Sequence, residues 1–237
     1  MARIGMLTPS SNIVLEPITF EMVRGVPGVS VHFSRFKVTE IALSQQALGQ
    51  FTVEPILAAA ELLAHAKCDV IAWNGTSASW LGFESDERLV SQIEQATGVS
   101  AATCVLGYRT LFERLKLSKI GLVSPYTDDV QSRIMGNWTK AGYKFPAERH
   151  AGLADNFSFS TVTEAQIAKD VREVAAAGAD CAVILCTNMR GAVPCAELES
   201  DLGIPLLDSV TVTLWAALER IGADKKPFRK WGRMFDV

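Results

Sequence analysis

Short apolar runs rich in β-branched residues alternate with helical stretches along the whole 237-residue chain. This alternation is typical of βα units around a parallel sheet. The clearest helical stretch covers residues 52–66, where apolar residues recur at spacings of three and four and leave Glu54 and Glu61 on the outer face. We expect strands at 3–7, 29–36, 69–73, 100–103, 119–124, 144–149, 181–185 and 205–207, and helices at 52–66, 86–96, 105–115, 128–141, 164–177 and 210–221. The pattern therefore predicts an α/β fold.

The chain also repeats itself. Residues 4–9 (IGMLTP) resemble residues 120–125 (IGLVSP), an offset of 116 (120 − 4). Residues 69–76 (DVIAWNGT) resemble residues 180–187 (DCAVILCT) with one residue of slip, an offset of 111 (180 − 69). Gly98 and Gly203, each ahead of a helix that ends in Glu-Arg, give a third match. Offsets that shrink in order indicate a duplicated unit with shortened loops; the alternative is that any two βα series look alike.

Duplication predicts two pseudo-symmetric lobes, each a short, mostly parallel sheet flanked by helices. We assign residues 1–98 and 209–237 to lobe A and residues 99–208 to lobe B. Ligands of open parallel sheets bind at the carboxyl ends of the strands. Two lobes that face each other would therefore share one active site in the cleft between them.

Composition and charge limit the classes of partner that the protein can bind. The chain has 23 basic and 26 acidic residues and a formal charge of −3, so we expect no nucleic-acid partner. No run approaches the ~18 apolar residues of a membrane helix, and the N-terminus does not resemble a signal peptide. We therefore expect a cytoplasmic protein without a membrane partner, and leave open whether its apolar helices form a homo-oligomer.

The four strand-end loops, at residues 8–12, 74–79, 125–129 and 186–191, hold the candidate site residues. The first loop contains Pro9, Ser10, Ser11 and Asn12 just before a helix. Its hydroxyl, amide and N–H groups would suit a carboxylate, although an ordinary helix cap explains the same residues.

The second and third loops offer donors to an anion. Gly75 lets a ligand approach the backbone, and Thr76 and Ser77 supply O–H and N–H groups. A capped turn is the alternative for these residues. Tyr126 in the third loop would donate its phenol to a developing negative charge, or lie on the surface.

The fourth loop begins with a cysteine, Cys186. We expect its pKa to be lowered by the next helix and by nearby N–H groups. The repeat places Cys186 opposite Gly75, so one lobe offers a thiol where the other offers nothing. A single thiol suits proton delivery from one side, and Gly75→Cys should then create racemisation. The other cysteines are expected to be buried and structural: Cys68, Cys104, Cys181 and Cys195.

Motifs for other chemistries are missing from the sequence. His32, His65 and His150 are scattered and lack the spacing of metal ligands. The sequence also lacks the glycine-rich phosphate loops and the G-x-S-x-G elbow. We therefore expect neither a metal nor an organic cofactor.

Residues 4–12, the Gly75-Thr76-Ser77 loop, Tyr126 and Cys186 together resemble the aspartate/glutamate racemase superfamily, in its branch of maleate cis-trans isomerases and arylmalonate decarboxylases. The similarity extends over nearly the full chain. It implies two α/β lobes, a cofactor-free site between them and carbon-acid chemistry on small carboxylates. Within the branch, racemases and maleate isomerases carry two thiols, whereas arylmalonate decarboxylase has glycine at the first position, as this chain does.

The resemblance points to both activities of the branch. Thr76, Ser77 and Tyr126 match the dioxyanion hole of the decarboxylase. Residues 9–12 and 154–156 are more similar to the maleate isomerases, as is Arg35, which would be a second carboxylate anchor or a surface charge. The substrate-binding residues expected on this basis are Pro9, Ser10, Ser11, Asn12, Thr187, Asn188, Asn156 and Arg35.

We therefore expect a cofactor-independent decarboxylase of a 2-aryl or 2-alkyl malonate. Its small-molecule substrate would pass through an enediolate, held by the donors above and protonated by Cys186. One alternative is a maleate isomerase or a racemase of the same superfamily. The other is a carboxylate-binding protein without catalytic activity.

Overall fold

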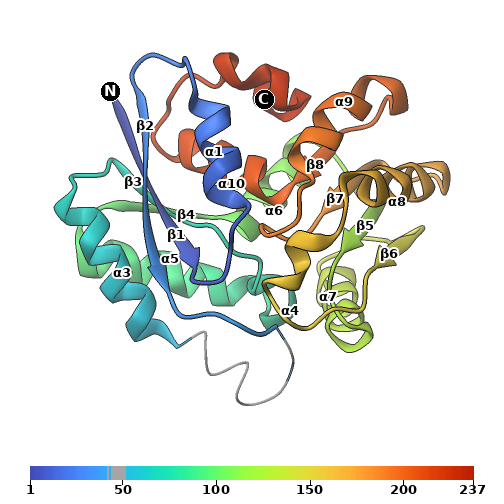
Figure 1. The fold of residues 1–237 in the computed structure, drawn as a ribbon, viewed down its shortest axis with the longest axis horizontal. Coiled ribbons are helices and arrows are strands. Elements are labelled where there is room, and N and C mark those ends of the chain that lie inside the picture. The colour runs from blue at the N-terminus through green and yellow to red at the C-terminus, as the bar shows by residue number, and fades with distance from the viewer. Residues whose placement is uncertain (42, 44–51) are drawn as a thin grey trace.

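Two parallel four-stranded sheets form the centre of the described chain, which covers residues 1–41, 43 and 52–237 of the computed structural model. They lie side by side in Figure 1. The first sheet has the order β2-β1-β3-β4 and the second β6-β5-β7-β8. The strands are β1 (Ala2–Pro9), β2 (Val29–Phe36), β3 (Val70–Trp73), β4 (Ser100–Thr103), β5 (Ile120–Ser124), β6 (Glu148–His150), β7 (Cys181–Ile184) and β8 (Leu206–Asp208). The identical order in the two sheets confirms the predicted α/β architecture.

Equivalent contacts recur in the two sheets. The Asp69 N–H donates to the Arg3 carbonyl at 2.8 Å, and the Asp69 carboxylate accepts from the Arg3 N–H at 2.7 Å. Asp180 makes the same pair of bonds with Lys119, at 2.7 and 2.9 Å. The agreement extends from strand order to individual hydrogen bonds, as expected of a duplicated unit.

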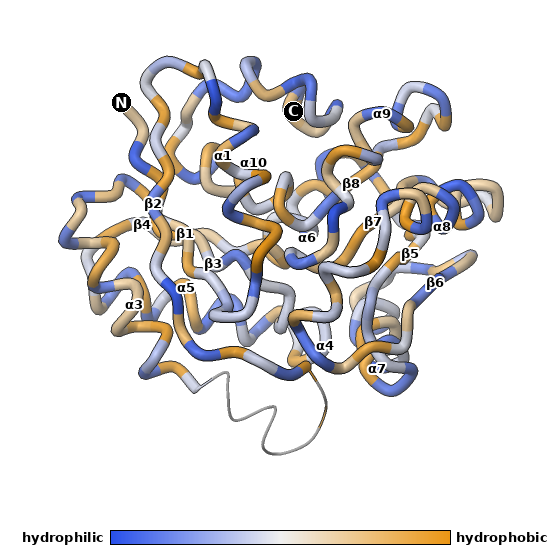
Figure 2. Tube along the Cα trace, viewed as in Figure 1, coloured by the Kyte–Doolittle hydropathy of each residue, from blue (hydrophilic) through white to orange (hydrophobic). Residues whose placement is uncertain are grey.

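Helices cover the faces of both sheets. They are α1 (Leu15–Val23), α3 (Val53–His65), α4 (Ala78–Leu81), α5 (Phe83–Thr97), α6 (Cys104–Leu115), α7 (Asp128–Lys140), α8 (Glu164–Ala176), α9 (Ala192–Leu202) and α10 (Ser209–Arg220), with short 3₁₀ helices η2 (Ser158–Thr161), η3 (Lys226–Trp231) and η4 (Arg233–Asp236). Every residue of β3, β5 and β7 is buried, because parallel strands are covered on both faces. Outer helices such as α8 mix apolar and polar segments in Figure 2.

Helices α6 and α10 join the two sheets. The Tyr108 hydroxyl of α6 lies 3.1 Å from the Ile184 carbonyl and 3.2 Å from the Leu207 carbonyl, both in the second sheet. In the opposite direction, α10 follows β8 and packs on β3 and β4 of the first sheet. The helices approach closely at Gly107, where a Cβ would lie 3.0 Å from Ala216. The helix that follows the last strand of each sheet thus contacts the other sheet.

Strand β4 belongs to the first sheet, since Val70–Trp73 pair with Ser100–Thr103. The expected boundary between residues 98 and 99 assigns this strand to lobe B, so that assignment is corrected. The sequence repeat agrees with the pairing, because it matches Gly98 with Gly203 and so keeps the strand after Gly98 in the first unit. The division of the rest of the chain into lobes remains a prediction.

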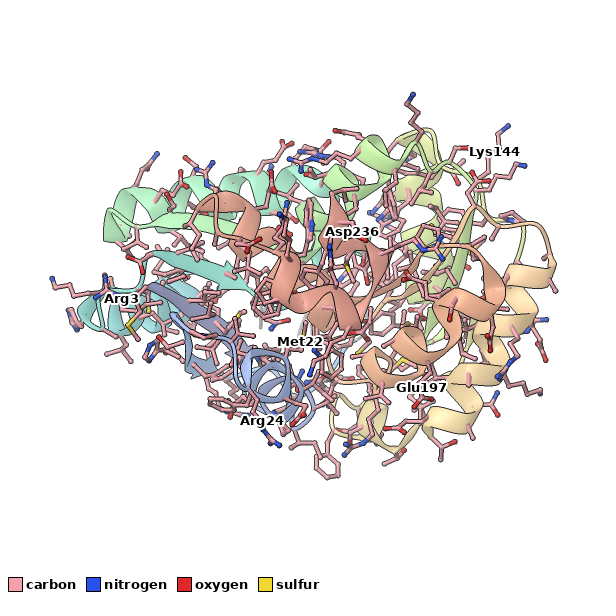
Figure 3. All side chains as sticks on the ribbon, turned by 90° about the horizontal axis from the view of Figure 1, so that it is seen from above. Arg3, Met22, Arg24, Lys144, Glu197 and Asp236 are labelled. Atoms are coloured by element: carbon pink, nitrogen blue, oxygen red, sulfur yellow. The ribbon has the colours of Figure 1, made fainter. Side chains whose placement is uncertain are left out.

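The two sheets turn their carboxyl ends towards the middle of the molecule. Arg3 lies at the amino end of β1, and Lys144 pairs with Lys119 at the amino end of β5. In Figure 3 these two labelled residues, Arg3 and Lys144, lie at opposite ends of the molecule. The loops that follow β1, β3, β5 and β7 therefore meet between the sheets.

Candidate functional site

A cavity of about 20 Å³ lies among these loops. The residues that line it are Pro9, Val38, Ile41, Trp73, Gly75, Thr76, Ser77, Trp80, Tyr126, Asn156, Cys186 and Thr187. They come from the strand-end loops of both sheets and from the segment that follows β2. The structure thus brings together most of the residues singled out in the sequence, in one small and largely buried space.

Tyr126 links the two halves of the cavity. Its hydroxyl lies 2.6 Å from Thr76 Oγ1 of the first half, and it forms a hydrogen bond with the Cys186 thiol of the second. Burial raises the pKa of Tyr126 well above its usual value. The phenol therefore remains a hydrogen-bond donor at neutral pH.

Cys186 is buried at the carboxyl end of β7, and its environment keeps the thiol protonated. Burial raises its pKa to about 12, although the hydrogen bonds from the Asn188 N–H, 3.3 Å from Sγ, and from Tyr126 act in the opposite direction. The expected lowering of this pKa is therefore wrong. The next helix, α9, begins only at Ala192, and the loss of solvation outweighs the nearby donors.

Gly75 faces the indole of Trp73 rather than open space. A Cβ built at Gly75 would lie 2.1 Å from Trp73 Cζ2. Trp73 is the last residue of β3 and is 1% exposed, and its Nε1 is buried without a hydrogen-bond partner in the part of the chain that the structure describes. The place where a second thiol would stand is therefore filled by an aromatic ring.

Asn12 and Thr187 connect the halves behind the cavity. The Asn12 Nδ2 donates to Thr187 Oγ1 at 3.1 Å, while its Oδ1 accepts from the N–H groups of Val14 and Leu15 at the start of α1. Thr187 Oγ1 in turn donates to the Asn74 carbonyl at 3.3 Å. Asn12 thus combines the capping role and a role at the site.

A second chain of amides runs through Asn156. Its Nδ2 donates to Ser11 Oγ at 2.7 Å, and its carbonyl accepts from Asn188 Nδ2 at 2.6 Å. Asn188 Oδ1 also accepts from the Ile13 N–H at 3.0 Å. Of these residues only Asn156 is among those lining the cavity, so Ser11 and Asn188 position the loops rather than face the space between them.

Ser10 and Arg35 lie outside the cavity lining. Ser10 is exposed, and its Oγ donates to the Val38 carbonyl at 3.2 Å. Arg35 forms an ion pair with Glu16 at 2.8 Å and donates to the carbonyls of Ser10 and Asn12 at 2.9 Å. These contacts favour the surface-charge alternative for Arg35, which holds the first loop in place.

The sequence reasoning missed part of the apolar lining. Trp73 and Trp80 flank the loop at 74–79, and the Trp80 ring packs edge-on against Tyr126 at 5.4 Å between centroids. Val38 and Ile41 follow the edge strand β2. The two tryptophans could have been found, because they stand directly beside a loop already assigned to the site.

Other kinds of site are not found in the described part of the chain. It contains no group of three or more His, Cys, Asp or Glu side chains placed to hold a metal ion. No helix among the same residues has the length and apolarity needed to cross a membrane. All five cysteines are buried and free.

Comparison with known proteins identifies the family. Residues 28–235 match the family described as arylmalonate decarboxylase. This chain belongs to the arylmalonate decarboxylase family. The match covers every strand except β1, and all the described α-helices except α1, both of which precede residue 28.

Relatives of both activities are similar to this member of the arylmalonate decarboxylase family. A maleate isomerase from Geobacillus stearothermophilus is 25% identical over 234 residues, covering 92% of this chain and 91% of the relative. An arylmalonate decarboxylase from Bordetella bronchiseptica is 24% identical over 187 residues, covering 78% of each. The maleate cis-trans isomerase of Nocardia farcinica, solved with TRIS bound, superimposes with a TM-score of 0.89 at 20% identity, over 99% of this chain and 98% of that one.

Proposed function

We propose that the protein is a cofactor-independent decarboxylase of a malonate-type dicarboxylate. The observation that carries the proposal is the single protonated thiol of Cys186 opposite Gly75, where an indole occupies the room for a second thiol. One acid on one face suits a reaction that needs one proton delivery.

The hydroxyls of the site would hold one carboxylate of the substrate. Thr76, Ser77 and Tyr126 line the cavity together, and all three are buried. When the bond between the α-carbon and the other carboxylate breaks, CO₂ leaves and the electron pair passes into the bound carboxylate, giving an enediolate. Preorganised donors stabilise this charge, each by ~3 kcal/mol in comparable sites.

The leaving carboxylate would lie against the apolar part of the lining. Val38, Ile41 and Trp80 offer no charged partner there. A carboxylate in such a place is poorly solvated, whereas the neutral CO₂ that it becomes suits apolar surroundings. A lining that combines hydroxyl donors with apolar side chains therefore favours the loss of CO₂.

Cys186 would complete the reaction as an acid. The S–H bond breaks, the proton adds to the α-carbon with the electron pair of the enediolate, and the thiolate regains a proton from water. Because this thiol is protonated at neutral pH, it is ready to donate. Delivery from one face would give a product of one configuration.

A maleate isomerase is the second candidate function, since a maleate isomerase matches over 92% of this chain and the arylmalonate decarboxylase over 78%. The raised pKa of Cys186 argues against it where the thiol has to attack as a nucleophile, because the thiolate is the reactive form. A racemase of the same superfamily would need an acid or base on the face that Trp73 covers. A carboxylate-binding protein would bind these acids without converting them.

The test is turnover by the wild-type protein and two cysteine variants. We expect CO₂ release from 2-substituted malonates, one deuterium at the α-carbon in deuterated water, and a loss of at least ~10³-fold in kcat in Cys186→Ala. Cys195→Ala is the matched control, because Cys195 is also buried but does not line the cavity.

Other results would select the alternatives. Conversion of maleate to fumarate without CO₂ release would favour the isomerase. Exchange of an α-hydrogen without CO₂ release would favour a racemase. Tight binding of dicarboxylates with no turnover would favour the binding protein, and full activity in a folded Cys186→Ala variant would remove the thiol from the mechanism.

A further inference from the structure

Trp73 separates the site cavity from a second, larger cavity. It lines both spaces, and the second has a volume of about 290 Å³. Apolar side chains of α3, α4 and α5 contribute much of the second lining: Val53, Ile56, Leu81 and Leu89. Among the described residues, the only other one common to both linings is the small Ser77. A partly apolar space, whose lining also includes Ser85, Asp86, Arg88 and Gln92, therefore lies directly behind the indole.

Packing alone holds the indole of Trp73 in this position. Its ring lies against the Gly75 backbone and 5.1 Å from the ring of Phe36, measured between centroids. The buried Nε1 makes no hydrogen bond to the described residues. A smaller apolar side chain at position 73 would break no hydrogen bond of the indole, and the volume it vacates would join the two cavities.

We propose that Trp73 is the specificity-determining residue that limits the size of the substituent on the substrate's α-carbon. The inference rests on the proposed decarboxylation and deepens it by naming the substrate class. With the indole in place, the site accepts a malonate with a short alkyl substituent. An aryl substituent needs the space that the indole and the cavity behind it occupy.

Two observations support this role. The site cavity of about 20 Å³ holds about one water molecule, so its lining has to move before any malonate binds, and Trp73 is the bulky lining side chain with a larger cavity on its other side. Asp86, the buried acid of the second cavity, has its pKa raised to about 7 by burial and is neutral below that pH. The apolar part of the space behind Trp73 suits a neutral, apolar group, while Arg88 lies elsewhere in the same lining.

The experiment compares methylmalonate with phenylmalonate in wild type, Trp73→Leu and Trp138→Leu. For each acid, kcat/KM is measured by CO₂ release and Kd by calorimetry. We expect wild type to favour methylmalonate, and Trp73→Leu to move the ratio of kcat/KM values towards phenylmalonate by at least ~10-fold, a typical effect of pocket size. Trp138 is a matched control, since it is a fully buried tryptophan that lines neither cavity.

The possible outcomes distinguish a failure of the role proposed for Trp73 from a failure of the proposed decarboxylation. Turnover with an unchanged ratio in a folded Trp73→Leu variant, or a wild-type preference for phenylmalonate, would overturn the role of Trp73 and leave decarboxylation standing. No CO₂ release, but a shift of the Kd ratio in Trp73→Leu alone, would overturn decarboxylation and support the role of Trp73. An equal shift in Trp138→Leu, or the absence of both binding and turnover, would overturn the role of Trp73.

Discussion

At the scale of single residues, the contact between Gly75 and Trp73 changes what a second thiol would do. The sequence alone predicts that Gly75→Cys creates racemisation. In the structure the new Cβ would lie 2.1 Å from the Trp73 ring, so the ring has to move before a second thiol fits. We now expect Gly75→Cys alone to lose ~1–3 kcal/mol of stability through overpacking and to show no racemisation.

The double variant Trp73→Leu/Gly75→Cys should recover part of that stability, because the smaller side chain removes the clash. It should also exchange the α-hydrogen of a 2-alkyl carboxylate, since an acid or base then stands on each face. Urea unfolding and deuterium exchange measure the two effects. A single Gly75→Cys variant as stable as wild type would show that the ring moves freely, contrary to this expectation.

At the scale of elements, the sequence predicted best what periodicity and repetition encode. Strands β3, β5 and β7 were found because buried parallel strands are continuous apolar runs, and the loops after them were found because they follow those runs. Helices α1 and α9 were expected after the first and fourth loops, but their bounds were not predicted. Neither N-cap residue, Val14 or Gly191, forms a side-chain hydrogen bond, and each helix carries a proline in its first turns, so the exact starts are hard to predict.

The contacts of the site were harder to predict than its location. Neither the indole over Gly75 nor the high pKa of Cys186 follows from spacing, because both depend on which side chains bury the loops. The pairing of Asn12 with Thr187 likewise joins segments far apart in sequence. Tertiary packing, rather than local pattern, decides these features.

Asn12 provides a prediction at this scale, since it both caps the start of α1 and bonds across the site. Asn12→Ala should lose ~1 kcal/mol for the cap, in addition to the bond with Thr187. Asn12→Ser should recover the cap because serine is an equally good acceptor there, but its short side chain cannot replace the amide donor. Urea unfolding of the two variants measures the difference. Equal stabilities of Ala and Ser variants would show that the capping bonds contribute little.

At the scale of the whole molecule, two buried acids lie where the sheets exchange helices. Asp208 ends β8 and caps α10 through the Val210 and Thr211 N–H groups, and Asp86 on α5 forms a hydrogen bond with Thr103, which caps α6. Burial raises the pKa of both acids to about 7. Each has one carboxylate oxygen buried without a hydrogen-bond partner among the described residues. We therefore expect the stability of this joint between the two sheets to depend on pH.

The sign of this dependence follows from the raised pKa. Between about pH 4 and pH 7 the folded protein binds these protons more tightly than the unfolded chain, so the free energy of unfolding falls as the pH rises. The slope is ~1.4 kcal/mol per pH unit for each fully shifted group. Asp208→Asn keeps an oxygen for the two N–H groups and cannot ionise, so its stability should fall less than that of wild type between pH 5 and pH 8.

Asp180 is a control acid, because its pKa is lowered rather than raised, and its contribution to stability should depend on pH in the opposite direction. The N–H groups of Ser118 and Lys119 lower the pKa of Asp180, which is half-buried, so Asp180→Asn should lose stability at neutral pH, and its difference from wild type should shrink as the pH falls through the pKa of the folded protein. Urea unfolding at several pH values tests both variants. If the curve of Asp208→Asn runs parallel to that of wild type, Asp208 does not ionise on the folded protein in this range, and the pH sensitivity of the joint would have to come from Asp86 alone.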